Sequence, residues 1–172
     1  SDIEALVALK PDLGIAWETG NPAGQVDKLR TFGLTVYASQ PNRMEDIAGQ
    51  LERFGQLAGT RPVADQAAAR FRQQLEGLRT RNAGKPTVRV FYQIWQAPLM
   101  TVGGPQIISD AIRLCGGENV FANLAQMAPT VSVEAVLKAD PEAIVATGMG
   151  DARPEWLDDW NKWTRMTAAP SR

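Results

Sequence analysis

The stretch TRPVADQAAARFRQQLEGLRTRNAGK, residues 60–85, decides how the chain is organised, because the sequence on either side of it is typical of α/β units and this segment is not. Its apolar residues recur at helical spacing, Pro62 stands where a first helical turn tolerates proline, and the stop signal NAGKP follows at residues 82–86. A helix over residues 62–81 would be about 30 Å long at 1.5 Å per residue, long enough to join two lobes. An ordinary surface helix within one domain has the same spacing.

Length and composition are those of an ordinary globular protein. The chain has 172 residues, 44% of them hydrophobic and 22% charged, which suits one domain or two small lobes. Eighteen basic residues stand against nineteen acidic ones, so charge gives no reason to expect nucleic acid or an anionic membrane as partner. The sequence contains no apolar run long enough for a transmembrane helix and does not open with a signal peptide, although a signal could have been removed.

Cysteine and histidine content excludes several kinds of chemistry. Cys115 is the single cysteine and histidine is absent, which rules out an intramolecular disulfide, a Ser-His-Asp or Cys-His catalytic site and a histidine metal site. Cys115 lies between Leu114 and Gly116 at the end of an apolar helical pattern. We expect it to be a small buried hydrophobic residue.

The first half of the chain predicts an α/β unit with parallel strands. Helices are expected over residues 2–9, 26–33 and 44–57, and strands over 13–17 and 34–38. Trp17 and Glu18 follow the first strand directly. Open α/β sheets bind their ligands at the carboxyl ends of such strands, so these two residues are candidates for a binding site.

The second half begins with a strand over residues 87–95 that alternates apolar and other residues. A helix over 107–114 ends at Gly116 and Gly117, residues 119–130 form a loop, and Ser132 caps a helix that leads into a strand over 143–147. Three tryptophans at helical spacing, Trp156, Trp160 and Trp163, form an aromatic stripe near the C-terminus. Core packing is their expected role, and a ligand platform is the alternative.

Two passages of the chain are alike: IEALVALKPDLGIAWETG at residues 3–20 and VEAVLKADPEAIVATGMG at residues 133–150. Each has a short helix, a turn with lysine, aspartate and proline, a buried strand and a polar loop with glycine. Chance similarity between α/β units is one explanation. A true internal repeat is the other, and it would give two like lobes that each present a strand-end loop to a shared cleft.

The chain resembles the helical-backbone class of periplasmic substrate-binding proteins. The resemblance rests on the order of these segments: VALKPDLGIAW, a long helix, RVFYQIW, LCGGENVF and SVEAVLKADPEAIV. These proteins serve ABC importers for vitamin B12, haem and iron–siderophores, and residues 3 to about 163 are most similar to the vitamin B12-binding members. The resemblance implies a partial N-terminal lobe at 1–59, an interlobe backbone helix at 60–85 and a partial C-terminal lobe at 86–172. It also implies an extracytoplasmic protein, periplasmic or lipid-anchored, that captures a small-molecule ligand between the lobes, needs no cofactor and docks on a membrane permease.

The ends of the chain depart from the family pattern. Family members carry further strands before the position of Ser1 and a closing strand and helix after Arg172, so the sequence resembles a fragment. Strand edges left open in a fragment invite pairing with another chain, which makes a homodimer a possibility.

Site residues follow from the resemblance position by position. A tryptophan at the place of Trp17 packs on the corrinoid in the B12-binding members, and Glu18 stands beside it. Large flat macrocycles are held by aromatic and apolar faces, a role for which Trp95, at a strand end, is preferred over Tyr92. The family's aromatic positions in the second lobe fall at Met100 and Ala128, which leaves room for another corrinoid or a different chelate.

Docking on the permease uses one surface glutamate per lobe in this family, and Glu134 matches the C-terminal one. Its alternative role is to support the Ser132 cap of its own helix. The N-terminal position falls at Ala23, so that contact is lost or is made by Glu18.

Other ligands and functions remain as alternatives. Haem is disfavoured by the lack of histidine and the presence of only two tyrosines, and an anionic siderophore would draw on arginines such as Arg89 and Arg153. A doubly wound α/β enzyme is a different class of function, but no Walker motif and no nucleophile–base pair is present. A structural or signalling domain derived from the carrier is the third hypothesis.

Overall fold

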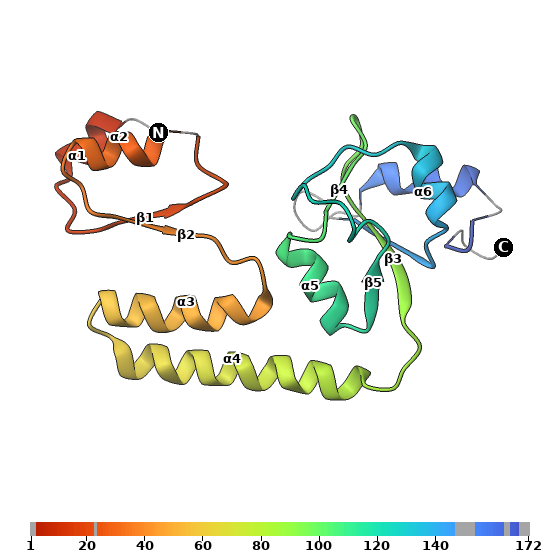
Figure 1. The fold of residues 1–172 in the computed structure, drawn as a ribbon, viewed down its shortest axis with the longest axis horizontal. Coiled ribbons are helices and arrows are strands. Elements are labelled where there is room, and N and C mark those ends of the chain that lie inside the picture. The colour runs from red at the N-terminus through yellow and green to blue at the C-terminus, as the bar shows by residue number, and fades with distance from the viewer. Residues whose placement is uncertain (1–2, 23, 147–153, 164–165, 169–172) are drawn as a thin grey trace. The chain divides into compact units, whose positions relative to one another are not determined.

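The structure of the chain is a computed structural model that describes residues 3–22, 24–146, 154–163 and 166–168. Residues divide into two units, Ser1–Pro41 and Asn42–Arg172, and each is described by itself (Figure 1). The chain has a mixed α/β fold with parallel strands in both units, as its sequence predicts. The predicted lobe boundary after residue 59 stays a prediction.

Unit Ser1–Pro41 consists of helices α1 (Ile3–Ala8) and α2 (Gln25–Thr31) and strands β1 (Gly14–Trp17) and β2 (Val36–Ser39). The two strands are parallel, with Gly14 opposite Val36 and Trp17 opposite Ser39. Each helix precedes a strand, which is the order that the apolar periodicity predicts. Ala16 is the buried apolar residue of this unit, so the described part of it has a small core.

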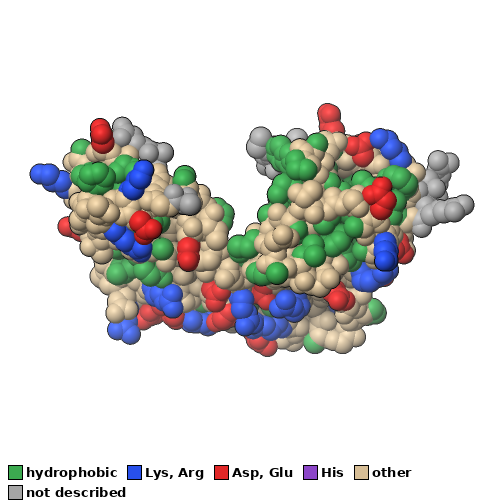
Figure 2. All heavy atoms as spheres, turned by 45° about the horizontal axis from the view of Figure 1, so that its top comes forward, with side chains coloured by type: hydrophobic (Ala, Val, Ile, Leu, Met, Phe, Trp, Pro, Cys, Tyr) green, Lys and Arg blue, Asp and Glu red, His purple; other side chains and the backbone are tan. Residues whose placement is uncertain are grey.

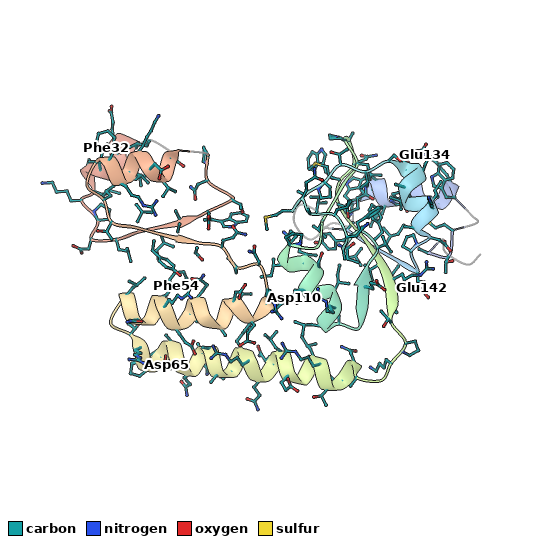
Figure 3. All side chains as sticks on the ribbon, viewed as in Figure 1. Phe32, Phe54, Asp65, Asp110, Glu134 and Glu142 are labelled. Carbon is teal, nitrogen blue, oxygen red and sulfur yellow. The ribbon has the colours of Figure 1, made fainter. Side chains whose placement is uncertain are left out.

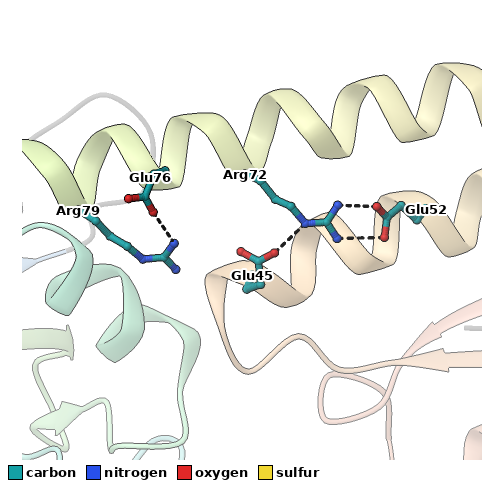
Figure 4. Close-up of polar contacts among 5 residues, drawn as sticks. All are labelled: Glu45, Glu52, Arg72, Glu76 and Arg79. Atoms are coloured by element: carbon teal, nitrogen blue, oxygen red, sulfur yellow. Dashed lines mark hydrogen bonds and ion pairs between the residues drawn. The ribbon is translucent and has the colours of Figure 1, made fainter.

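Unit Asn42–Arg172 begins with two long helices, α3 (Met44–Leu57) and α4 (Arg61–Asn82), that lie side by side (Figure 1). Their contact is close because Gly55 of α3 meets Ala64 of α4. Arg72 of α4 donates to Glu45 and, through both terminal nitrogens, to Glu52 of α3 (Figure 4). The Arg72 hydrogen bond lowers the pKa of Glu52, and the two glutamates raise the pKa of Arg72. Acidic and basic side chains are mixed along these helices (Figure 2).

The sheet of this unit is built around β3 (Val88–Trp95). Strand β4 (Met100–Thr101) pairs with it antiparallel, and β5 (Gly117–Asn119) and β6 (Ala143–Ala146) pair with it in parallel. Helices α5 (Ile107–Leu114), α6 (Val133–Ala139) and the 3-10 helix η1 (Glu155–Lys162) complete the unit. Its core contains Phe91, Phe121, Val136, Trp160 and Met166.

Several predictions of local structure are confirmed. Helices α3 and α5 have the predicted bounds, and α4 extends the predicted helix by one residue at each end. Ser132 caps α6 by accepting a hydrogen bond from the Ala135 backbone N–H at 3.1 Å.

Two predictions are wrong. Cys115 is exposed rather than buried, and it is the residue that caps the C-terminal end of α5. The second wrong prediction concerns β5, because Gly117 was expected to end a helix and Asn119 to begin a loop, whereas both lie in this strand. Gly117 is required there by close packing, since a Cβ at this position would lie 2.8 Å from Ile112 and 3.1 Å from Val90.

Within the part of the chain that the structure describes, no helix is both long enough and apolar enough to cross a bilayer. Helix α4 has the length, with 22 residues, but it is rich in arginine and glutamine.

Candidate functional site

Trp17 ends β1 with its side chain at the surface, where 59% of the residue is exposed. Its backbone N–H donates to Asn21 Oδ1 at 2.8 Å, and the Asn21 N–H donates back to the Trp17 carbonyl at 3.0 Å. A Cβ on Gly20 would lie only 2.0 Å from the indole, so glycine is needed for the ring to lie against this turn. Trp17 therefore presents an exposed aromatic face that its own loop holds in place, and it is not a core residue.

Glu18, the next residue, is exposed, and its backbone N–H donates to the Ser39 carbonyl at 3.1 Å. The hydroxyl of Thr19 donates to Gln40 Oε1 at 2.7 Å, so the loop after β1 is attached to the end of β2. The carboxyl ends of both strands are thus joined by hydrogen bonds. A flat ligand could stack on the indole and receive polar contacts from Glu18.

Trp95 ends β3 in the other unit and is 54% exposed, and its indole N–H donates to the Ala97 carbonyl at 3.0 Å. Tyr92 is buried, so Trp95 is the more accessible aromatic residue of this strand. Met100 of β4 is half-buried and pairs with Trp95, with a register shift between Gln93 and Trp95. This irregularity interrupts the side-chain alternation at the end of the strand and leaves Trp95 at the surface.

A cavity of about 430 Å³ opens beside the end of β3. Its lining comes from the loop after β3, the start of α6 and η1: Gln93, Gln96, Ala97, Leu99, Val133, Trp156, Asp159, Trp160 and Trp163. Size and aromatic content are those of a small-molecule pocket. Sequence reasoning missed this cavity, although the tryptophan stripe was a signal for it.

Hydrogen bonds and an ion pair join several of the polar side chains at this cavity. The Trp160 indole donates to Gln93 Oε1 at 2.7 Å and packs edge-on against Phe91, with ring centroids 5.5 Å apart. The Gln96 amide donates to Asp159, and Lys162 pairs with the same carboxylate at 2.7 Å, which lowers the pKa of Asp159. Trp160 is therefore a core residue, as the sequence predicts, although it also lines the cavity. Trp163 is 43% exposed, so the expected core packing is wrong for this tryptophan.

Glu134 lies exposed in the first turn of α6 (Figure 3). Its own backbone N–H and the Ser132 hydroxyl lower the pKa of its carboxyl, so Glu134 is ionised at neutral pH. An exposed, charged glutamate at this place suits a surface contact with a basic partner.

The remaining candidates lie elsewhere. Arg89 is at the amino end of β3, where it donates to the Ala139 carbonyl at 3.1 Å and pairs with Glu142 at 3.6 Å. These contacts give it a structural role. Ala128 is exposed, and Arg153 and Ala23 fall outside the described residues.

The structure thus places the predicted ligand residues at two strand ends: Trp17 and Glu18 in the first unit, Trp95 and Met100 in the second. Among the described residues, no cluster of three or more carboxylate or cysteine side chains is arranged to hold a metal ion. Aromatic stacking is the chemistry that these residues offer.

Comparison with known proteins finds a family model, described as periplasmic binding protein, that matches residues 1–172. The vitamin B12-binding protein of Vibrio parahaemolyticus is 39% identical over 163 residues, 94% of this chain and 58% of that protein. Its counterpart in Vibrio cholerae is 37% identical over 168 residues, 98% of this chain and 60% of that protein. The chain therefore spans somewhat over half the length of these relatives.

Solved structures show the same likeness. The periplasmic vitamin B12 binding protein BtuF of Vibrio cholerae superposes with a TM-score of 0.84 at 35% identity, over 98% of this chain and 65% of that one. A periplasmic heme binding protein from Pseudomonas aeruginosa has a TM-score of 0.78 at 24% identity, over 97% of this chain and 63% of that one. At that identity the second likeness shows the fold alone.

Proposed function

The chain belongs to the periplasmic binding protein family, and on that premise we propose that it captures cobalamin or a related corrinoid for an ABC importer. The family comprises substrate-binding proteins of the periplasm, which confirms the prediction of a binding protein rather than an enzyme. Relatives that are 37–39% identical are named as vitamin B12-binding proteins, and they support the choice of ligand.

The exposed indole of Trp17 is the observation that carries this proposal. A corrinoid is a wide, flat macrocycle whose cobalt already has ligands, so the protein needs aromatic surface more than metal-binding side chains. Trp17 offers such a surface without any rearrangement of its loop, because Asn21 and Gly20 hold the backbone and the ring. Glu18, Trp95 and Met100 are the further proposed contacts.

The finer architecture that goes with this function is also a proposal. Two lobes, 1–59 and 86–172, would be joined by a backbone helix at 60–85, and the permease would be the macromolecular partner. Glu134 is the proposed docking residue because it is exposed and ionised at the start of α6. Haem has less support, because the sequence lacks histidine and Tyr92 is buried.

A titration tests the proposed ligand. Cyanocobalamin is added to the chain, to its Trp17→Ala variant and to the Vibrio cholerae vitamin B12-binding protein as a positive control, with heat and tryptophan fluorescence as readouts. Phe32→Ala is the matched variant, because Phe32 is 61% exposed in the same unit but lies away from the strand end (Figure 3). We expect saturable 1:1 binding that Trp17→Ala weakens at least tenfold and Phe32→Ala leaves unchanged.

Two results would count against the proposal. Binding by Trp17→Ala as tight as by the parent chain would remove Trp17 from the site. Saturable binding of haemin, with no heat from cyanocobalamin while the control protein binds it, would replace the corrinoid by haem.

A further inference from the structure

A basic groove lies at the amino end of β3, the end of the sheet opposite to Trp95. Its volume is about 300 Å³, and its walls come from the start of α3, the last turns of α4 and α5, and the residues just after these two helices. Three arginines and one aspartate line it: Arg43, Arg79, Arg113 and Asp110. These side chains give the groove a formal charge of +2, although the whole chain has a charge of −1.

Both carboxylate oxygens of Asp110 already have partners within the protein. Asp110 Oδ2 accepts from the Met44 backbone N–H at 2.8 Å, and its Oδ1 pairs with Arg113 at 2.8 Å. Its side chain is only 13% exposed, and it lies where α5 meets the start of α3 (Figure 3). Asp110 therefore fastens two helices together and has little capacity left to neutralise the other two arginines.

The arginines keep most of their hydrogen-bonding capacity. Among the described residues, no carboxylate pairs with the Arg43 side chain, and Arg79 has a single, exposed pair with Glu76 at 3.3 Å (Figure 4). Arg113 uses one terminal nitrogen for Asp110, and 65% of its side chain is exposed. Each guanidinium has five N–H donors, so most of the donors at this groove are open to a ligand.

The helices that carry these arginines are joined to one another by partly buried hydrogen bonds. Asn82 at the end of α4 donates its amide hydrogens to the Leu78 carbonyl and to the Leu114 carbonyl of α5, both at 3.0 Å. Asp110 makes the corresponding link from α5 to α3. Three helices are thereby held in one arrangement with an arginine from each, which lowers the entropic cost of binding a ligand between them.

We propose that this groove binds a phosphate-class oxyanion, either free phosphate or pyrophosphate or the phosphate of a lipid headgroup. Guanidinium groups bind phosphate oxygens in bidentate pairs, and three of them around one small groove match an anion with several oxygens. The groove shares no lining residue with the proposed corrinoid contacts. An anion bound there would tie α3, α4 and α5 together and stabilise the folded unit.

Calorimetric titration of the full chain with sodium pyrophosphate, at ionic strength kept constant with sodium chloride, tests the proposal. The matched variants are Arg79→Gln and Arg81→Gln, which remove the same charge from the same turn of α4, since Arg81 is exposed and does not line the groove. We expect saturable binding that Arg79→Gln and Arg43→Gln each weaken about tenfold or more. Arg81→Gln should change it less than twofold.

Vesicles distinguish the two sources of phosphate. Co-sedimentation with phosphatidylglycerol vesicles, but not with phosphatidylcholine vesicles, that is lost in Arg79→Gln and competed by pyrophosphate would assign the site to lipid headgroups. Pyrophosphate binding without vesicle binding would assign it to free oxyanions. Equal losses in Arg79→Gln and Arg81→Gln, or no saturable binding of either probe by the correctly folded chain, would overturn the proposal.

Discussion

Replacing Gly55 by alanine is expected to destabilise the helical pair α3 and α4, although the same change at Gly77 is expected to stabilise it. Both glycines lie inside helices, where alanine is intrinsically better by about 1 kcal/mol. Their surroundings differ. A Cβ at Gly77 would have nothing within 4 Å, whereas a Cβ at Gly55 would lie 2.1 Å from the Ala64 Cβ and 3.3 Å from the Arg61 Cα.

The expected magnitudes follow from this contact. Carbon atoms in van der Waals contact are about 3.5–4.0 Å apart, and the Ala64 methyl cannot rotate away from its backbone. Helix α4 must therefore move, and overpacking of this kind costs about 1–3 kcal/mol. After a gain in helix propensity of about 1 kcal/mol is subtracted, Gly55→Ala should lose up to roughly 2 kcal/mol, while Gly77→Ala gains about 0.5–1 kcal/mol.

Urea unfolding followed by far-ultraviolet circular dichroism measures this difference as a shift of the midpoint in opposite directions. Ala64→Gly supplies an internal check, because it removes the methyl group that the new Cβ would meet. In the double variant the clash is absent, so the two substitutions should be strongly non-additive. Equal stability of Gly55→Ala and Gly77→Ala, or simple additivity of the double variant, would refute the proposed close packing of these helices.

Two further predictions concern charged groups in the second unit. Glu134→Gln should leave corrinoid binding unchanged but lower uptake by cells that carry the cognate importer. Glu118→Gln is the control, because Glu118 is another exposed glutamate of this unit. Normal uptake with Glu134→Gln would exclude Glu134 from docking. Hydrogen bonds from the Thr167 backbone and hydroxyl lower the pKa of Asp140, so this contact is present at neutral pH and is lost only as the pH falls through the lowered pKa, below the ordinary aspartate value of about 3.9. Amide-exchange protection of Thr167 should fall over that range in the parent chain. It should be independent of pH in Asp140→Asn, because the asparagine amide oxygen can still accept from the Thr167 N–H but does not titrate, and asparagine also tolerates the left-handed backbone at this position. A parent-like pH profile in the variant would contradict this.

The long helices and the central strand could be predicted from the sequence because their own residues determine them. Helix α3 repeats an apolar residue every third or fourth position, and α5 does the same over two turns. The residues of each helix are therefore sufficient to predict which side is buried. Strand β3 has alternating residues with high β propensity. Parallel pairing of β1 with β2 follows from the helix that separates them.

Strand β5 could not be predicted because its determinants lie elsewhere in the chain. Gly117, Glu118 and Asn119 have low β propensity. The segment is held by pairing with β3 and by Asn119, whose buried amide donates to the Val102 carbonyl and to the Ser109 hydroxyl, both at 2.8 Å.

The same distinction separates the candidate sites. Trp17 was found because a single rule, that ligands bind at strand ends, needs only the residues that follow one strand. The basic groove was missed because its arginines are some 35 residues apart in the sequence and meet only when three helices pack. Yet part of the signal was present: Arg79 follows Leu75 by four residues and so lies near the apolar face of α4, whereas Arg81 is turned from it by about 200° at 3.6 residues per turn. Position on the helix therefore distinguishes Arg79 from Arg81, although both carry the same charge. For this reason, comparing the two substitutions tests binding in the groove and not a general effect of removing one positive charge.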